Sequence, residues 1–236
     1  MLGSAIVDAV EEAGGIAIAT TRSPGKIAAL NQEAEQHQKT RRFAQLDFAD
    51  EAALKAGVAE IVSDYGPVTG LVNNAYAALP FKSVEETGWE HWNAAMSVSV
   101  AASSSLAVAL AREQALESVV NISSMYGIVA PRFAMYPEGM EPNPLVYGPS
   151  KAAMLALTRY LAAYWGERGI RVNAVSPGGV ANRQNETFLS RYNETVPMQR
   201  MVSPQEVAQA VCFLLSRGAG GITGENLVVD AGRTIW

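Results

Sequence analysis

The segment Glu117-Ser-Val-Val-Asn-Ile-Ser-Ser124, followed by Tyr147-Gly-Pro-Ser-Lys151 and Ile170-Arg-Val-Asn-Ala-Val-Ser-Pro-Gly-Gly179, decides the fold of this chain. The first and third segments are short apolar runs, rich in β-branched residues, that end in turn residues, which predicts two strands. Between them, Leu145 to Trp165 is alanine-rich and has the length of a long helix. A strand, a helix and a second strand in this order predict parallel strands joined by a crossover helix.

The same alternation runs along the rest of the chain and contains no linker or internal repeat. Helices are predicted at Gly3–Ala13, Pro24–Gln38 and Glu51–Tyr65, with one long or broken helix over Glu85–Gln114. Strands are predicted at Ile16–Thr21, Arg42–Leu46 and Val68–Val72, and a closing strand lies within Gly224–Gly232. We therefore expect residues 1–236 to form a single α/β domain with a doubly wound, Rossmann-like parallel sheet.

Three side chains near the centre of the pattern have the chemistry of a proton-transfer site. Tyr147 and Lys151 are four residues apart and share one face of the predicted helix. A nearby ammonium group favours the phenolate and lowers a tyrosine pKa that is ordinarily near 10. The hydroxyl of Ser124, at the end of the preceding strand, is suited to hold a carbonyl or alcohol oxygen against the tyrosine. The three residues predict general acid/base catalysis.

Composition fits a soluble enzyme domain. The chain has 236 residues, 49% of them hydrophobic, and a net charge of -5, which argues against nucleic-acid and membrane-surface partners. No apolar run is expected to reach the length of a membrane span, and the start lacks the pattern of a signal peptide. Cys212 is interpreted as a reduced core residue, and with only His37 and His91 besides it we predict no metal site. The cytoplasm is the expected compartment.

Over nearly its whole length the chain resembles the short-chain dehydrogenase/reductase family. The matching pieces, in order, are Leu46-Asp47, Leu71-Val-Asn-Asn-Ala75, Ser124, Tyr147 with Lys151, Ser176-Pro-Gly-Gly-Val180 and Gly224-Glu-Asn-Leu-Val-Val-Asp-Ala-Gly232. The resemblance implies hydride transfer between a nicotinamide and a carbonyl or secondary alcohol. It also implies a homodimer or homotetramer, because the helices matching Ala101–Ala111 and Tyr147–Trp165 often pack against a second subunit in this fold.

The resemblance also indicates the residues that hold the cofactor. They are Gly3, Thr21, Arg22, Ser23, Asp47, Phe48, Asn74, Ala75, Tyr147, Lys151, Pro177, Gly178 and Val180. NAD-preferring members carry an acidic residue near the end of the second strand, and none is present here. Arg22, flanked by two hydroxyls, suits a 2'-phosphate by charge and by bidentate hydrogen bonding, so NADP(H) is favoured over NAD(H).

Other polar residues at strand ends are given supporting roles. Asp47 is expected to cap the turn that follows it and to touch adenine rather than to take part in the chemistry. The asparagines at the strand ends are expected to brace these ends rather than to react; they are Asn73, Asn74, Asn121 and Asn173.

The start of the chain departs from the family. Met1-Leu-Gly3-Ser-Ala-Ile6 matches the end of the glycine-rich loop, so the first strand and the earlier glycines have no counterpart. That strand is central in the fold, and without it both neighbouring strands are expected to keep unpaired backbone groups. A wrongly assigned start codon or a clipped chain is therefore favoured over a working enzyme without its first strand.

Further departures concern the substrate side. Ser99 stands where the family usually has an asparagine that supports the lysine through a water, and it is a candidate member of the relay. Tyr76 replaces a glycine and is expected to face the cavity or to pack. The segment between Ser124 and Tyr147 is unusually long and reads as a specificity loop. Its candidate substrate contacts are Arg132, Tyr136, Glu138 and Asn143.

The function predicted is therefore NAD(P)-dependent oxidation or reduction of a polar small molecule. The region Ala181–Pro197 reads as a polar lid, and together with the long loop it resembles members from surface-sugar and flagellin-modification pathways. Two alternatives remain open. One is a pseudoenzyme or scaffold subunit that has lost dinucleotide binding, and the other is an epimerase or dehydratase that retains its nicotinamide.

Overall fold

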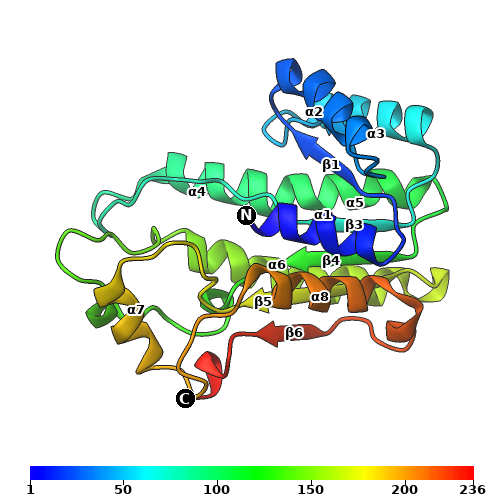
Figure 1. Ribbon diagram of the computed structural model, residues 1–236. Helices are drawn as coiled ribbons and strands as arrows, with labels where there is room; N and C mark the ends of the chain where they lie inside the picture. The colour runs from blue at the N-terminus through cyan, green and yellow to red at the C-terminus, as the bar shows by residue number, and fades with distance from the viewer.

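The fold, described for all residues 1–236 by a computed structural model, alternates strands and helices as the sequence predicts (Figure 1). The strands are β1 (Ile18–Thr21), β2 (Arg42–Gln45), β3 (Gly70–Asn73), β4 (Ser118–Ile122), β5 (Arg171–Pro177) and β6 (Asn226–Val229). The helices are α1 (Leu2–Glu12), α2 (Pro24–Gln36), α3 (Glu51–Tyr65), α4 (Trp89–Met96), α5 (Ala102–Arg112), α6 (Tyr147–Trp165), α7 (Glu186–Asn193) and α8 (Pro204–Leu215).

Local sequence explains several of these boundaries. The Asp50 side chain accepts hydrogen bonds from the amides of Ala52 and Ala53, so it caps the first turn of α3. Ser203 and Glu206 form a reciprocal capping box at the start of α8, with a proline in the first turn. β4 is buried at every position, as expected for a strand covered on both faces of a parallel sheet.

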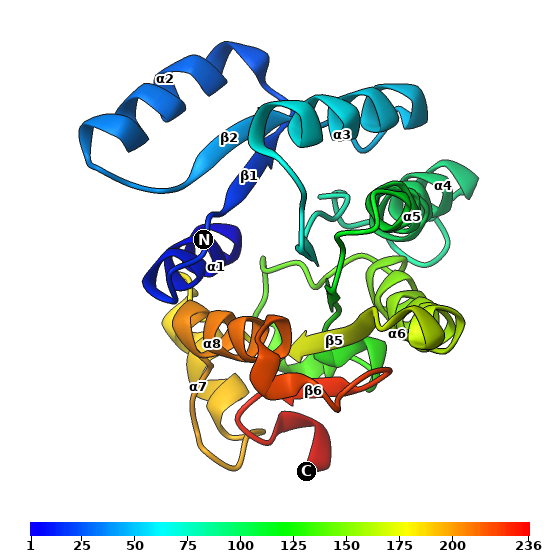
Figure 2. The same cartoon turned by 90° about the vertical axis from the view of Figure 1, so that its right-hand side faces the viewer.

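The sheet is parallel throughout but is divided into two parts. Strands β3, β4, β5 and β6 pair in that order, and β1 pairs only with β2. One face of the larger part packs against α5 and α6, and the other packs against α1 and α8 (Figure 2). Val119 and Val172 face the first layer, whereas Val120 and Val175 face the second, as alternation along strands requires.

The division lies where the family's first strand was expected to be missing. No strand of residues 1–236 lies between β1 and β3, and a cavity of about 970 Å³ separates them. Its lining is mostly apolar and comes from β1, β3, α1 and α5. The expectation that both flanking strands lack a ladder partner on this side is confirmed.

Side-chain contacts hold the segment that contains β1, β2 and α3 to the rest of the domain. The guanidinium of Arg41, just before β2, pairs with Glu11 and with Asp8 of α1. The hydrogen bond from Arg41 lowers the pKa of Glu11 from 4.5 to about 2. In addition, α3 packs its Leu54, Val58 and Ile61 into the core beside α5. This segment is therefore attached through side chains where strand pairing is absent.

The predicted helix over Glu85–Gln114 is broken by a π turn at Ser97–Ala101, between α4 and α5. By length and composition the stretch Trp89–Arg112 is apolar enough to cross a membrane, so the expectation that no run reaches that length is wrong. In the fold it packs against α3 and α6, and small residues at this contact explain its apolar composition. Cys212 of α8 is a free thiol that is only partly buried against the other layer.

Candidate active site

Ser124 and Tyr147 are brought together where β4 ends. After β4, Ser124 caps a 3-10 turn at Met125–Gly127, and its hydroxyl accepts the amide of Tyr126 at 3.1 Å. This turn packs directly on the first turn of α6. A Cβ added to Gly127 would lie 2.9 Å from the Lys151 carbonyl carbon, and one on Gly148 would lie 3.0 Å from the Tyr126 carbonyl oxygen. The two glycines permit the close approach that sets the serine beside the tyrosine.

Lys151 lies one turn after Tyr147 on the same face of α6, as predicted. Its side chain is only 3% exposed, and Nζ donates a hydrogen bond to the Ile122 carbonyl at 2.9 Å. Nζ is 5.7 Å from the centre of the Tyr147 ring and 5.8 Å from that of Tyr76. The ammonium group therefore lies between two aromatic rings, where a cation is favoured electrostatically.

Burial dominates the titration of both groups. It lowers the pKa of Lys151 from 10.5 to about 8. It raises the pKa of Tyr147, and the Ser124 hydroxyl opposes that shift by hydrogen bonding to the phenol. The sequence predicted a Tyr147 pKa lowered by Lys151, and that direction is wrong for this arrangement, because desolvation is the largest cause of the shift and Lys151 is not among the groups that lower the pKa. Tyr147 is thus held as a neutral phenol that is ready to donate its proton.

A network of asparagines braces the strands beneath this set. Asn73 Nδ2 donates to Asn121 Oδ1 at 2.8 Å, and Asn121 Nδ2 donates to the Thr158 hydroxyl on α6 at 2.9 Å. Asn173 links β5 to the loop before β6 through Ile222 and Glu225. For these three asparagines, the expected bracing contacts are present.

Ser99 is buried in the π turn and makes no side-chain hydrogen bond to the protein. The π turn packs against α6, the helix that carries Tyr147 and Lys151. A π turn inserts an extra residue into a helix and often occurs at functional sites. The relay role of Ser99 stays a prediction.

The candidate cofactor residues follow the carboxyl ends of the strands on the same edge. A Cβ on Gly3 would come within 3.3 Å of Asn74 Nδ2, so the first turn of α1 lies against the end of β3. Arg22 is exposed and unpaired, and the amide of Ser23 donates to the Thr21 hydroxyl at 3.2 Å. Candidates elsewhere along this edge are Asp47, Phe48, Ala75, Pro177, Gly178 and Val180.

Asp47 caps the turn after β2, as expected: its Oδ1 accepts the amide of Ala49 at 2.9 Å. Glycines in the turn after β5 allow neighbouring residues to pack closely against it. A Cβ on Gly178 would lie 2.8 Å from the Asp230 Cα, and one on Gly179 would lie 2.7 Å from the Tyr192 ring. The turn is therefore in contact with both the end of β6 and α7.

The residues predicted to contact substrate are divided between the site and the surface. Tyr76 is edge-on to Tyr147, with ring centres 6.1 Å apart, and its backbone does not require positive φ. The Tyr136 hydroxyl lies 3.1 Å from that of Tyr126, whose ring is in turn edge-on to Tyr147. Exposed positions without a side-chain partner are occupied by Arg132, Glu138 and Asn143.

Three aromatic residues that were not predicted from the sequence, Tyr126, Phe188 and Tyr192, join the long loop to the lid. Phe188 and Tyr192 of α7 are buried, and the Tyr136 ring packs on Phe188 with centres 5.2 Å apart. The lid predicted to be polar thus carries an apolar inner face. Phe188 and Tyr192 are four residues apart, and this helical spacing is the sequence signal from which the apolar face could have been predicted.

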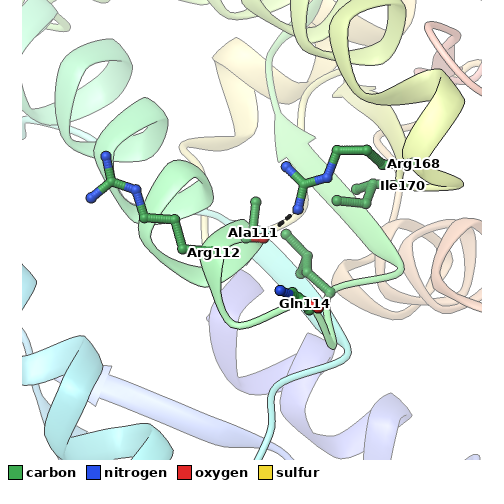
Figure 3. Close-up of a pocket in the computed structure, with 6 residues that line it drawn as sticks. Ala111, Arg112, Gln114, Arg168 and Ile170 are labelled. Carbon is green, nitrogen blue, oxygen red and sulfur yellow. Dashed lines mark hydrogen bonds between the residues drawn. The ribbon is translucent and has the colours of Figure 1, made fainter.

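A second cavity, of about 440 Å³, lies at the other edge of the sheet (Figure 3). Its walls include Arg112 at the end of α5 and Arg168 after α6, and Arg168 donates to the Ala111 carbonyl. These residues precede β4 and β5, whereas ligands of this fold bind beyond the carboxyl ends of the strands. No group of three or more His, Cys, Asp or Glu side chains is placed to hold a metal ion.

The chain is similar in sequence to a family of reductases and to several named dehydrogenases. The family model described as enoyl-(acyl carrier protein) reductase matches residues 2–234. The inactive 2-(S)-hydroxypropyl-CoM dehydrogenase 2 of Xanthobacter autotrophicus is 35% identical over 201 residues, covering 80% of this chain and 83% of that protein. Galactitol 2-dehydrogenase (L-tagatose-forming) of Cereibacter sphaeroides is also 35% identical, covering 80% and 74%. The post-translational flagellin modification protein A of Campylobacter coli is 26% identical, covering 98% and 93%.

Solved structures share the fold. A gluconate 5-dehydrogenase from Burkholderia cenocepacia, in complex with NADP and tartrate, superposes with a TM-score of 0.89 at 24% identity, covering 100% of this chain and 92% of that one. A blue fluorescent protein from a metagenomic library, in complex with NADPH, gives 0.83 at 27% identity, covering 98% and 93%. The chain therefore belongs to the short-chain dehydrogenase/reductase family of NAD(P)-dependent oxidoreductases.

Proposed function

We propose that this chain transfers a hydride between NADP(H) and a carbonyl or secondary alcohol of a polar small molecule. The observation that carries the proposal is the convergence of Ser124, Tyr147 and Lys151 at the carboxyl end of β4, where Lys151 is buried and Tyr147 is partly buried. Perturbed titratable groups beside a strand end are the usual mark of an acid/base site.

Each side chain has a role in the reducing direction. The Ser124 hydroxyl donates a hydrogen bond to the substrate oxygen and fixes it against Tyr147. Tyr147, which burial keeps neutral, gives its proton to that oxygen as negative charge develops. The Lys151 ammonium lies near the ring and stabilises the phenolate that results. When bound, the nicotinamide supplies or accepts the hydride at C4.

The residues along this edge fit a dinucleotide in the parts that the chain provides. Gly3 has no Cβ, and a Cβ there would lie 3.3 Å from Asn74 Nδ2. The glycine therefore leaves space beside the first turn of α1, next to Asn74. Arg22 has no internal partner, which supports a role in binding a 2'-phosphate. We propose that the turn at Pro177–Val180 offers backbone groups to the carboxamide.

The substrate is proposed to be a polyol, sugar or sugar-derived molecule. Relatives that are named for galactitol oxidation and for flagellin modification support this class. So do the three phenol hydroxyls of Tyr126, Tyr136 and Tyr192, which lie between the long loop and α7. A substrate rich in hydroxyls makes hydrogen bonds with such groups.

The cavity between β1 and β3 is the observation that favours the alternative function. In this fold, a strand at that position leads into the turn that approaches the pyrophosphate. A chain whose sheet is divided there is also compatible with a pseudoenzyme that no longer binds dinucleotide. We propose that residues 1–236 act as one domain and that filling this cavity improves binding, which separates the two functions by experiment.

Assembly and compartment follow the family expectation. Tyr160 and Tyr164 of α6 stack on each other with ring centres 6.4 Å apart, and both are about 70% exposed. Exposed aromatic pairs on a helix are typical of a protein interface. We propose a homodimer or homotetramer through this face and a cytoplasmic location. Analytical ultracentrifugation of the Tyr160→Ser, Tyr164→Ser variant tests the interface.

The test of the activity is a change in NADPH absorbance with a panel of ketoses and keto acids, and in NADP⁺ with polyols. Turnover that is lost in Tyr147→Phe and kept in Tyr164→Phe supports the proposal. Release of the cofactor during turnover separates a dehydrogenase from an epimerase. Conversion of a substrate with no net change in nicotinamide absorbance would favour the epimerase or dehydratase, which returns the hydride to its substrate.

A further inference from the structure

Arg233 is a buried arginine whose charge has no partner in the protein. It begins the 3-10 turn at Arg233–Ile235, directly after β6, and is only 3% exposed. Its Nε is completely covered and has no hydrogen-bond partner. Neither terminal nitrogen makes a hydrogen bond, and no carboxylate oxygen lies within ion-pair distance of the guanidinium.

Such a group is costly in an isolated domain. A guanidinium carries five N–H donors and cannot lose its charge at neutral pH, so its burial without an acceptor is unfavourable. A buried polar group without a partner calls for an explanation, and a bound anionic ligand is one that would complete this arginine. The acid nearest in sequence, Asp230, is already engaged, because its two oxygens accept the amides of Gly232 at 2.8 Å and Thr234 at 2.6 Å.

The surroundings of Arg233 add further donors. The hydroxyls of Tyr126 and Tyr136 are 3.1 Å apart, so one of their two hydrogens is shared between them and the other is free. The Tyr192 hydroxyl accepts the Gly179 amide at 2.7 Å, and its own hydrogen meets only the Met125 sulfur at 4.0 Å. Donors therefore outnumber acceptors in this cluster.

The phenols of Tyr126 and Tyr192 stay protonated, and the positive charge of Arg233 influences the pKa of each. Burial raises the pKa of Tyr126 and of Tyr192, and the positive charge of Arg233 opposes both shifts. The arginine is not among the groups that shift the pKa of Tyr147, which responds instead to Tyr76 and Tyr136. The chain just before Arg233 lies beside these phenols: Ala231 packs against the cluster that contains Tyr126 and Tyr192, and a Cβ on Gly178 would touch both Asp230 and the Tyr192 hydroxyl.

We propose that Arg233, with the phenol hydroxyls of Tyr126 and Tyr192, binds a carboxylate at the end of the substrate remote from the reacting carbon. The inference rests on the proposed function and narrows its substrate to polar hydroxy or keto acids. A planar guanidinium matches a carboxylate through two parallel hydrogen bonds. A single negative charge suits the site better than a phosphate dianion, because one cation is present and the Asp230 carboxylate lies close to the same turn.

The proposal also explains why the long loop and the lid meet here. Tyr126 and Tyr136 come from the loop, and Tyr192 comes from α7, where Phe188 packs on Tyr136. Arg191 on the outer face of α7 lies near the carbonyls of Ala134 and Tyr136, at 3.4 and 3.5 Å. The two segments therefore enclose one binding site from both sides.

The test compares D-gluconate with D-glucitol, which has the same carbon chain and no carboxylate. Isothermal titration with saturating NADP⁺, and without it, gives the affinity of each compound for the full chain. The variants are Arg233→Met and Arg233→Lys, and the control is Arg112→Met, an exposed arginine at the opposite edge. NADPH affinity is measured in parallel by fluorescence.

Arg233→Met is expected to lose at least ~10-fold in gluconate affinity, with glucitol and NADPH affinities within about twofold of wild type. Arg233→Lys is expected to keep part of the gluconate affinity, and Arg112→Met all of it. If near-UV circular dichroism shows that Arg233→Met is misfolded, two other measurements test the carboxylate site. They are the gluconate affinity of Arg233→Lys and the protection of the wild type against heat by gluconate.

Equal losses for gluconate and glucitol would overturn the proposal and make Arg233 a structural residue. So would a wild-type chain that binds NADPH but prefers glucitol to gluconate, tartrate and glycerate alike, although the oxidoreductase function would then stand. Carboxylate binding that depends on Arg233 in a chain that never binds NADPH would keep this site and refute the proposed function.

Discussion

The hydroxyl of Tyr192 accepts a hydrogen bond from the backbone N–H of Gly179 at 2.7 Å, so helix α7 is tied to the turn after β5. Tyr192 is 1% exposed, and its ring occupies the space that a Cβ on Gly179 would need. The turn is the part of the chain expected to face the nicotinamide. We therefore propose that Tyr192 is a positioning residue that couples the lid to the cofactor side of the site.

Tyr192→Phe removes this hydrogen bond and leaves the ring in place. The free Gly179 amide loses its acceptor, so we expect NADPH affinity to fall by ~5- to 20-fold, corresponding to about 1–2 kcal/mol. The turnover number at saturating NADPH should change by less than about threefold. Fluorescence titration and steady-state kinetics measure the two effects, and Tyr65→Phe, whose hydroxyl makes only a long contact with Phe43, is the matched control.

If Tyr192 served only to fill the core, Tyr192→Phe would lower the melting temperature without changing NADPH affinity. A turnover number that falls as much as the affinity would place Tyr192 in the chemical step instead, against this assignment.

Tyr147→Phe and Ser124→Ala test the catalytic roles. Loss of the phenol removes the proton donor, and turnover is expected to fall by ~10²–10⁴-fold. Loss of the serine hydroxyl removes one hydrogen bond to the substrate oxygen and is expected to cost ~10²–10³-fold. NADPH affinity should remain within about threefold in Ser124→Ala. Turnover near wild type in Tyr147→Phe would show that another group donates the proton, and turnover near wild type in Ser124→Ala would show that the serine is not needed to hold the substrate oxygen.

Lys151 makes stability depend on pH. The ordinary pKa of its ammonium group is 10.5, and burial in the fold lowers this pKa to about 8. Between these two pH values the unfolded chain holds a proton that the folded chain has released, so the folded state becomes more stable as pH rises through the window. Below the folded-state pKa the buried charge reduces stability in full.

Lys151→Met removes that charge at the cost of the Ile122 hydrogen bond. We expect the free energy of unfolding at pH 7 to rise by about 1–3 kcal/mol while turnover is lost. The gain should shrink as pH approaches the unfolded-state pKa, and urea unfolding of both proteins at several pH values measures it. A gain that is the same at every pH would mean that the ammonium group is not desolvated.

The cavity lies between β1 and β3, which have no ladder partner on this side. An extension before Met1, consisting of about five alternating Val and Ile residues and a glycine-rich turn, is expected to complete the sheet. Each ~1 kcal/mol of added stability raises the melting temperature of a domain of this size by ~2–4 °C. NADPH affinity should rise as well, because the added turn approaches the pyrophosphate.

A Gly/Ser extension of equal length is the control for this change. Calorimetry and NADPH titration compare the two. If both extensions behave alike, the cavity does not accept a strand, and the division of the sheet is a stable feature of the fold.

Much of the fold followed from the sequence because its signals are local. Apolar strands that end in turn residues and alanine-rich helices indicated the order of elements, and the predicted helix Glu51–Tyr65 has the bounds of α3. The π turn at Ser97–Ala101 could not be predicted, since its residues have ordinary helical composition. Its position depends on how α4 and α5 pack on α6.

The site divides in the same way. Ser124, Tyr147 and Lys151 were predicted because spacing along one strand and one helix places them together. Tyr192 and Arg233 were not predicted, because the role of each depends on contacts with residues that are distant in the chain. The direction of the Tyr147 pKa shift was wrong for a similar reason, since burial depends on how the whole site packs.

The most direct test of the proposed oxidoreductase function is a fluorescence titration of NADPH into the 236-residue protein, with Lys151→Met as the matched variant. We expect saturable binding at one site per chain, tighter for NADPH than for NADH, and at least ~10-fold weaker in the variant. An absence of saturable binding of either dinucleotide, in the chain and in its strand-completed form, would contradict this function and leave a folded subunit without oxidoreductase activity.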